Sequence, residues 1–268
     1  MNVTIITPVH GTYEKYGNMI KEIGKKLDEQ TEQPHEWLVV CDEKSKWVND
    51  IKLPKFSKIL VAKKNNISIK RNMALDNMSG DYTFLLDSDQ MPKSKELLFE
   101  CIQKCSKDFD LLRIPEEFSN TGSYLKRSYH HLRALYWAKN DEGIPRFVKS
   151  KIINKVRFDP EMLHFEDRLF FDKIRENNRE GITKNKIIHN EDFELYPNLR
   201  KVRIAQKQSK VHNIKSNFRL GIFTIIKETP ISLLPGVIFI LGARTIAKRT
   251  LPVESGTCLL YTSDAADE

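Results

Sequence analysis

The stretch NNISIKRNMALDNMSGDYTFLLDSDQMP, residues 65–92, contains a predicted helix, a turn and a strand that ends in two aspartates. Apolar spacing predicts the helix over residues 69–78, and Ser79-Gly80 ends it. The apolar run over 81–86 predicts a buried strand, and Asp87-Ser88-Asp89 follows it directly. Because Asp and Ser favour turns, this triplet alone indicates a solvated turn. The alternative is a site for a metal ion and a charged ligand.

The same alternation of helix and strand extends to both sides of this stretch. Strands are predicted over residues 3–9, 36–41, 57–62 and 110–114, and helices over 13–29 and 93–105. Strands that are apolar on both faces indicate an α/β fold, with a mostly parallel sheet and helices on both faces. Ligands bind such sheets beyond the carboxyl ends of the strands. We therefore expect Asp42, Asp87 and Asp89 to face one crevice.

Composition narrows the class of partner without selecting it. The chain has 268 residues, of which 40% are hydrophobic, enough for one sizeable domain core. A net charge of +8 and a pI of about 9.1 favour an anionic partner, such as nucleic acid, anionic lipid or a phosphorylated small molecule. Four cysteines without a C-x-x-C pair indicate a reducing compartment, and no signal peptide is predicted.

Two carboxylates at the end of a strand have a physical use. An EF-hand is excluded, because its loop needs Gly and Glu where this chain has Pro92 and Leu98. Carboxylate oxygens on rigid backbone suit Mg²⁺ or Mn²⁺, and such ions bridge carboxylates to substrate phosphates. A cation there would neutralise the charge that develops on a leaving diphosphate. The expected cofactor is therefore Mn²⁺ or Mg²⁺.

An ordered set of motifs extends the pattern over residues 66–89. Asn66, Lys70-Arg71-Asn72, Gly80 and Asp87-Ser88-Asp89 follow one another in the order and spacing of the family-2 glycosyltransferases, and the stretch resembles that family. The segments VTIITPVHG and EWLVVCD resemble its first two strands. The resemblance implies a GT-A fold, which is a Rossmann-like, mostly parallel sheet. Lys70, where the family has Ala, and the missing Gly beside the first Asn are departures from its pattern.

The resemblance also implies roles for individual side chains. It assigns the binding of a nucleoside-diphosphate sugar, with UDP or GDP, to Pro8, Asp42, Asn66, Arg71 and Asp87. Pro8 and Asp42 would line the nucleoside pocket, and Arg71 would lie near the base or the phosphates.

The predicted metal ligands are Asp89, Asp87 and His189. The resemblance makes Asp89 the direct ligand and places Asp87 near the ribose and the metal. His189 follows a predicted strand over residues 186–189, where the family often has a His that completes metal or phosphate contacts. A lone His is otherwise more often a structural residue.

The predicted catalytic base comes from Glu166-Asp167, at the start of a helix predicted over residues 164–177. The resemblance implies that Asp167 deprotonates the acceptor hydroxyl in an inverting transfer, with Glu166 as the neighbouring alternative. Taken alone, the pair has another interpretation, because acidic residues are favoured near a helix N-terminus by the helix dipole.

The predicted domain organisation has three parts. Residues 1–215 form the GT-A domain, with a nucleotide-sugar half over 1–115 and an acceptor half over 116–215. Residues 216–257 form a helical, membrane-proximal tail. Residues 258–268 resemble the translation of a sequencing adapter and are predicted to be foreign to the protein.

The tail suggests a membrane surface. Residues 199–219 contain seven Lys or Arg and no acidic residue, and the apolar run over 231–243 is too short for a standard span. Two short amphipathic or re-entrant helices in the membrane interface fit better, with basic neighbours facing anionic lipid. The alternative is a helical hairpin packed on the domain. The expected location is cytoplasmic, peripheral at the inner face of the cell membrane.

The function expected from these observations is transfer of a sugar from a UDP- or GDP-sugar to a glycan or lipid-linked acceptor, in glycan or cell-surface polysaccharide synthesis. Nucleic acid is not an expected partner. A nucleotidyltransferase would need a Gly-rich phosphate loop near the first strand, for which His10-Gly11-Thr12 is a poor substitute. A non-catalytic anion-binding module would leave the aspartate triplet and Glu166-Asp167 unexplained.

Overall fold

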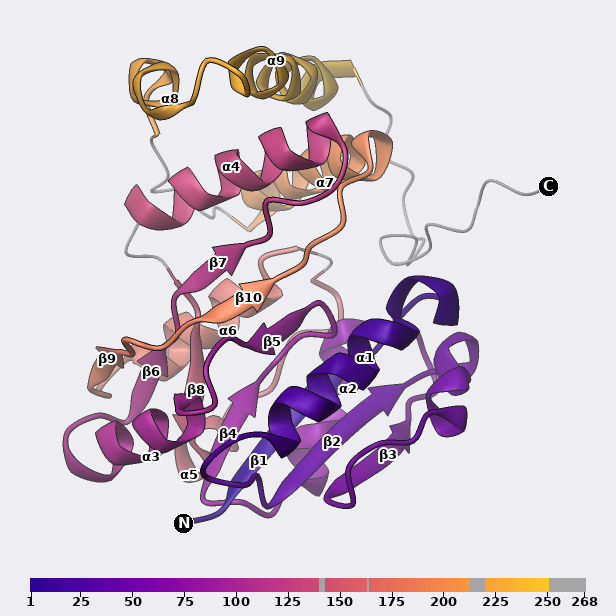
Figure 1. Cartoon of the computed structure of the whole chain (residues 1–268), viewed down its shortest axis with the longest axis vertical. Helices are drawn as coiled ribbons and strands as arrows, with labels where there is room; N and C mark the ends of the chain where they lie inside the picture. The colour runs from indigo at the N-terminus through magenta and orange to yellow at the C-terminus, as the bar shows by residue number, and fades with distance from the viewer. Residues whose placement is uncertain (140–142, 163, 213–219, 251–268) are drawn as a thin grey trace.

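A computed structural model describes residues 1–139, 143–162, 164–212 and 220–250. Its main sheet has seven strands in the order β3-β2-β1-β4-β8-β6-β9 (Figure 1). In that order the strands are β3 Ser57–Val61, β2 Glu36–Cys41, β1 Val3–Pro8, β4 Tyr82–Leu85, β8 Pro145–Lys149, β6 Leu111–Arg113 and β9 Glu180–Ile182. All neighbouring pairs are parallel except those of β8, which runs antiparallel to β4 and β6. The predicted α/β fold with a mostly parallel sheet is confirmed.

Helices cover both faces of this sheet, because successive side chains of the buried strands point to opposite faces. Ile5, Val39 and Phe84 pack in one core with α1, Tyr13–Asp28, and α3, Leu97–Lys107. Ile6, Val40 and Leu85 pack in a second core with α2, Ile67–Asn77, and α6, Glu166–Arg175. The short α5, Ser150–Ile153, follows β8, and the 3₁₀ helix η1, Glu43–Asp50, follows β2. The strand ends are thus held rigidly.

Gly80 has a steric role at the start of β4. Its backbone nitrogen donates to the Thr4 hydroxyl at 2.9 Å. A Cβ at this position would lie 2.6 Å from the Thr4 backbone nitrogen. Only glycine therefore allows the turn between α2 and β4 to approach β1 this closely.

A second, three-stranded sheet has the order β5-β10-β7. Its strands are β5 Gln90–Pro92, β10 Ile187–His189 and β7 Glu116–Phe118. The predicted helix over 93–105 was wrong at its start, because residues 90–92 pair with β10 and the Lys93 nitrogen donates to the Lys186 carbonyl. This pairing places His189 beside Gln90, directly after the aspartate triplet.

An outer helical layer lies on the side of the small sheet away from the main sheet (Figure 1). It contains α4 Tyr124–Lys139, α7 Leu195–Val211, α8 Ile222–Glu228 and α9 Leu234–Thr250. Helix α9 packs on α4 and α7, and the core that it shares with α4 includes Tyr129, Leu132, Val237 and Ile240. Within the described ranges, no helix is long and apolar enough to cross a membrane. The predicted boundary at residue 215 and the predicted adapter-derived stretch 258–268, with Cys258, lie outside the described residues.

Candidate active site

The aspartate triplet forms a turn that lies inside the protein. The Gln90 nitrogen donates to the Asp87 carbonyl at 3.0 Å, and the Asp87 nitrogen donates to the Gln90 side chain at 3.1 Å. Ser88 and Gln90 are buried. The turn interpretation therefore holds in part: the triplet is a turn, but Ser88 at its centre is buried.

Asp87 lies between two buried arginines. It accepts hydrogen bonds from Arg71 Nη2 at 2.8 Å and from Arg146 Nη1 at 3.2 Å. Arg71 belongs to α2 and Arg146 to β8, so two elements hold one carboxylate at the end of β4. Burial by itself would raise the pKa of Asp87, but the two guanidinium groups hold it well below its usual range. Asp87 is therefore ionised.

Arg71 connects this carboxylate to the acidic pair at the start of α6. Its Nη1 donates to Asp167 and lies 3.6 Å from a Glu166 oxygen, and its guanidinium stacks 5.1 Å from the centre of the Phe158 ring. Burial and the neighbouring Asp167 raise the pKa of Glu166 to about 8. Burial, opposed by Arg71, also raises the pKa of Asp167. Arg71 and the pair Glu166-Asp167 were predicted separately from the sequence, and the fold brings them into contact.

Asn72 orients the segment that leads to α6. Its side-chain amide donates to the Phe158 carbonyl at 2.8 Å and accepts from the Phe158 nitrogen at 2.8 Å. Phe165 then adopts a left-handed conformation, φ 66°, which is uncommon for a non-glycine residue and turns the chain into the helix. The asparagine of the Lys-Arg-Asn motif therefore joins α2 to the segment around Phe158, the residue on which the Arg71 guanidinium stacks.

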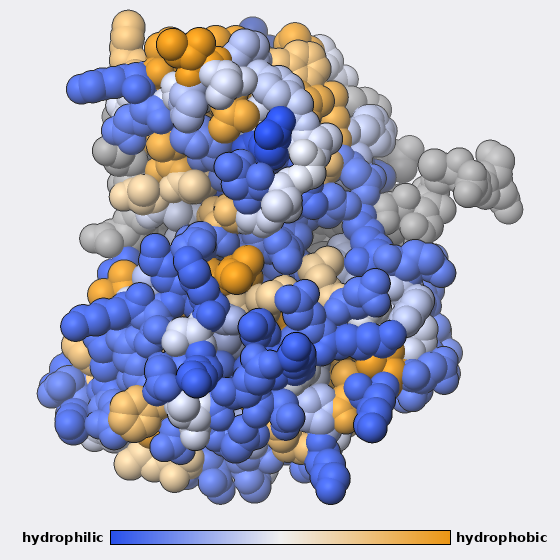
Figure 2. All heavy atoms as spheres, viewed as in Figure 1, coloured by the Kyte–Doolittle hydropathy of each residue, from blue (hydrophilic) through white to orange (hydrophobic). Residues whose placement is uncertain are grey.

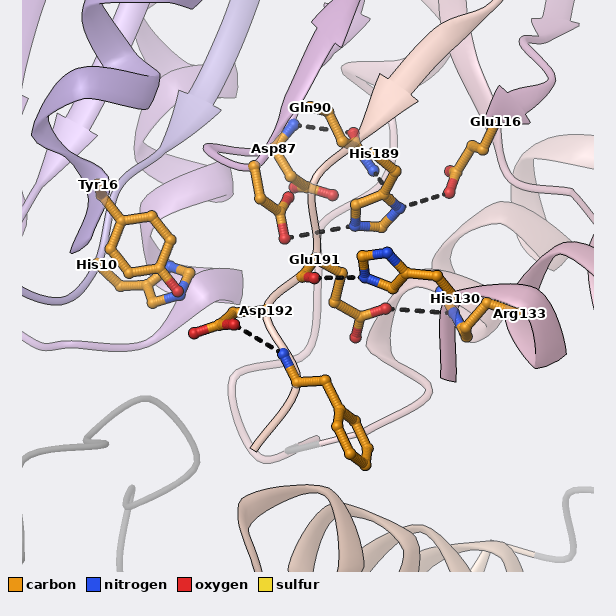
Figure 3. Close-up of polar contacts among 12 residues, drawn as sticks. His10, Tyr16, Asp87, Gln90, Glu116, His130, Arg133, His189, Glu191 and Asp192 are labelled. Atoms are coloured by element: carbon orange, nitrogen blue, oxygen red, sulfur yellow. Dashed lines mark hydrogen bonds and ion pairs between the residues drawn. The ribbon is translucent and has the colours of Figure 1, made fainter. Parts of the chain in front are cut away.

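His189 and Asp89 form a second cluster. His189 Nε2 lies 3.3 Å from Asp89 Oδ2. On the other side of the ring, His189 Nδ1 lies 2.7 Å from Glu116 Oε2 (Figure 3). Glu116 also accepts from Arg146 Nη2 at 2.8 Å. Burial alone would lower the pKa of His189, but the Asp89 and Glu116 carboxylates raise it to about 10. Arg146 therefore links the two clusters, through Asp87 on one side and Glu116 on the other.

Glu116 and Arg146 were missed by sequence reasoning. Both lie on short strands, and their polar partners are distant in sequence. The only local signal is a charged residue inside an otherwise apolar segment, as in PRFVK, residues 145–149. That signal does not identify a partner.

The residues present fit a divalent cation with few protein ligands. Among the described residues, no group of three or more His, Cys, Asp or Glu side chains is arranged to hold a metal. Asp89 and His189 nevertheless present an oxygen and a nitrogen side by side, and Mg²⁺ or Mn²⁺ often takes one or two protein ligands, with waters and substrate phosphates for the rest. Asp87, the third predicted ligand, is occupied by two guanidinium groups.

The predicted nucleoside residues lie at the ends of β1 and β2. Asp42 forms an ion pair with the buried Lys70, whose Nζ also donates to the Val9 carbonyl and to Asn65 at 3.0 Å. Pro8 ends β1 and is buried. Lys70, a departure from the family pattern, therefore ties both strand ends to the start of α2.

Asn66 and His10 complete the description of this edge of the sheet. Asn66 caps α2 by accepting from the Ile69 nitrogen at 3.0 Å, and it donates to the Pro160 carbonyl at 3.0 Å. His10 Nε2 lies 3.0 Å from the Tyr16 hydroxyl, and burial lowers the pKa of His10 to about 4. His10 and Tyr16 lie side by side in Figure 3, on the α1 side of the site.

Comparison with known proteins shows the fold. No protein-family model and no curated protein sequence matches the chain. It is similar in structure to TarS 1-349 of S. aureus in complex with UDP-GlcNAc, with a TM-score of 0.57 and 19% identity over 92% of this chain and 81% of that one. It spans about half (49%) of a longer TarS structure.

Two other solved structures share this architecture. The mannosyltransferase PcManGT of Pyrobaculum calidifontis, in complex with GDP-Man and Mn²⁺, has a TM-score of 0.58 and 15% identity over 92% of this chain and 75% of that one. Glucosyl-3-phosphoglycerate synthase of Mycobacterium tuberculosis, with Mn²⁺, UDP and phosphoglyceric acid, has a TM-score of 0.53 and 10% identity over 81% of this chain and 80% of that one. At these identities the likeness establishes a GT-A-type fold.

Proposed function

We propose that this protein is a glycosyltransferase that moves a sugar from a nucleoside-diphosphate sugar, with UDP or GDP, to a hydroxyl group of a glycan or lipid-linked acceptor. One observation carries the proposal. The Arg71 guanidinium contacts Asp87, at the end of β4, and Asp167, at the start of α6. The predicted donor and acceptor residues therefore meet at one side chain, within a fold shared with glycosyltransferase structures that contain sugar nucleotides.

In the proposed reaction Asp167 is the general base, with Glu166 as the alternative. The base takes the proton of the acceptor hydroxyl while the hydroxyl oxygen bonds to the anomeric carbon. The bond from that carbon to the diphosphate oxygen breaks on the opposite face, and its electron pair leaves with the diphosphate. The configuration at the anomeric carbon is therefore inverted. Burial raises the pKa of Asp167 against the effect of Arg71, which makes it a stronger base than a surface carboxylate.

On the donor side, Asp89 and His189 are the residues that would hold Mn²⁺ or Mg²⁺, with Asp87 beside them. The ion would supply positive charge to the leaving diphosphate. Arg71 and Arg146 compensate the charge of Asp87. Asp89, which forms an ion pair with His189 and, within the described residues, with no guanidinium group, is the carboxylate of the triplet that would bind the cation. Pro8, Asp42 and Asn66 remain proposed nucleotide-side residues.

The proposed setting is glycan or cell-surface polysaccharide synthesis at the inner face of the cell membrane. The cysteines of the described residues support a reducing compartment. Cys41, Cys101 and Cys105 form no disulfide, and all three are buried.

Donor binding gives a direct test. We expect the thermal unfolding midpoint to rise with UDP or GDP only when Mn²⁺ or Mg²⁺ is present, by an amount that corresponds to about 2.7 kcal/mol at a hundredfold excess over Kd. Asp89→Asn should abolish the cation-dependent part. Asp108→Asn, an exposed aspartate at the end of α3, is the matched control. Release of nucleotide from the matching sugar donor then tests transfer. A nucleotide shift that is equal without the cation, or equal in Asp89→Asn, would contradict the metal site.

A further inference from the structure

The outer helices α8 and α9 have an apolar face on each side. One face packs on the molecule, where Ile225, Val237 and Ile240 are buried against α4. The opposite face is exposed and holds large apolar side chains. These are Ile222, Phe223 and Ile226 of α8, Ile231 in the turn between the two helices, and Ile238, Phe239 and Ile246 of α9.

The degree of exposure is unusual for side chains of this size. Phe223 is 83% exposed and Ile231 is 88% exposed. On α9 the exposed residues Pro235, Ile238 and Phe239 continue to Gly242 and Ile246, which is the three-to-four spacing of one helix face. Figure 2 shows apolar side chains gathered at this end of the molecule, whereas the surface below is mostly hydrophilic. Contiguous apolar patches of this kind mark a docking surface.

Cations border this apolar face. Lys227 lies one turn from Phe223 on α8, and Arg249 follows Ile246 by three residues on α9. Lys248 is exposed next to it. Within the described residues 220–250 the basic residues are Lys227, Arg244, Lys248 and Arg249, and the acidic residue is Glu228. The border of the face is therefore positive.

A basic groove adjoins the C-terminal end of α9. It is a surface cavity of about 360 Å³ lined by Arg203, Gln206, Lys207 and Lys210 of α7. Arg203 donates to the Lys248 carbonyl, so the groove adjoins the end of α9 that carries Ile246 and Arg249. Three cationic side chains around a surface cavity next to exposed apolar residues match a phosphate headgroup at the boundary of a bilayer.

We propose that the exposed face of α8 and α9, with the groove on α7, docks on the surface of an anionic lipid bilayer. The apolar side chains enter the headgroup boundary, and Lys227, Lys248 and Arg249 face lipid phosphates. Neither helix crosses the bilayer, because the other face of each is buried in the protein. A second copy of the chain fits this face less well, since pairing the same face would place its cations opposite one another.

Vesicle flotation of the full chain, without donor or metal, tests the proposal independently of enzyme activity. The vesicles contain phosphatidylcholine alone or with about a third phosphatidylglycerol. We expect binding to the mixed vesicles that is at least about tenfold stronger than to neutral ones and that weakens with salt.

Three sets of variants identify the surface. The triple variant Phe223→Ser, Ile231→Ser, Phe239→Ser should lower the partition coefficient at least about tenfold. Ile182→Ser, at a 49% exposed isoleucine on β9, is the matched control and should bind as the unmodified chain does. Lys227→Gln, Lys248→Gln, Arg249→Gln together should remove the preference for anionic vesicles. Unchanged unfolding midpoints show that all variants are folded.

Three results would overturn the proposal. The first is an unmodified chain that stays unbound with anionic vesicles. The second is a serine triple variant that binds as strongly as the unmodified chain. The third is light scattering that shows a dimer of the unmodified chain and a monomer of the triple variant, with no vesicle binding by either; this face would then join two copies of the chain.

Discussion

Two clusters of carboxylates lie on either side of Arg146, and they differ in charge balance. Around Arg71 lie three carboxylates, those of Asp87, Glu166 and Asp167. Around Glu116 lie Arg146 and His189, with Asp89 beyond the histidine. The carboxyl groups of both clusters are largely buried, so desolvation tends to raise the pKa of each of them.

The pKa directions follow from that balance. Burial and Asp167 raise the pKa of Glu166 to about 8. Burial alone would also raise the pKa of Glu116, but Arg146 and His189 lower it to about 2. The first cluster can therefore take up a proton near neutral pH, as a base must, whereas Glu116 in the second cluster stays ionised. The same residue type serves either purpose, according to the number of cations beside it.

The largest effect should come from removing the base. We expect Asp167→Asn to lower kcat by about 10²–10⁴-fold, because the amide cannot accept the acceptor's proton. Donor affinity measured by thermal shift should change little. Asp172→Asn, on the same helix with a 53% exposed side chain, is the control. Full transfer activity in Asp167→Asn would move the base to Glu166 or remove it from this cluster.

A smaller effect should follow in the second cluster. Glu116→Gln replaces the charged acceptor of the His189 Nδ1 proton by a neutral amide, and such partners of a metal-ligating histidine typically contribute about 10–100-fold to metal affinity. Mn²⁺ binding measured by calorimetry or electron paramagnetic resonance, without donor, reports the change directly. Glu117→Gln, the next residue on β7 with an exposed side chain paired to Lys93, should leave it unaffected. Equal affinities for the two variants would make Glu116 a structural residue only.

The smallest effect should be on the pH dependence of the free energy of unfolding, which Glu166 contributes to through its raised pKa. The folded pKa of Glu166 lies above its unfolded value of about 4.5, so between pH 4.5 and 8 the folded state binds more protons. Stability should therefore fall as pH rises through this window, by up to about 1.4 kcal/mol per pH unit. Glu166→Gln should flatten urea unfolding data collected between pH 6 and 8. Glu117→Gln, on β7, should leave the slope in place, because the pKa of Glu117 is lowered by Lys93 and its carboxyl is ionised in both states over this range. An identical slope in Glu166→Gln would contradict the raised pKa.

The first half of the fold could be predicted closely. The predicted strand over residues 36–41 agrees with β2, and the predicted helix over 13–29 ends one residue beyond α1. These elements are long and apolar, so their periodicity is readable in the sequence. Strands β5, β7 and β10 have three residues each, too few for any period. The insertion of β8 between β4 and β6 could not be predicted either, since strand order depends on packing between distant segments.

Some features of the candidate site could likewise be predicted from the sequence, and others depend on the tertiary structure. Asp87 and Asp89 could be proposed as strand-end residues at one edge of the sheet. Arg71, Asp167 and His189 could be proposed through the resemblance of their motifs to those of the family-2 glycosyltransferases. The sequence by itself also determined the apolar character of residues 222–250 and the basic residues among them. Only the tertiary structure decided which carboxylate faces which cation. Asp87 is held by Arg146 and Glu116 by His189, across separations of 59 and 73 residues. Coulombic energy depends on distance in space and on burial, and neither can be read from position along the chain.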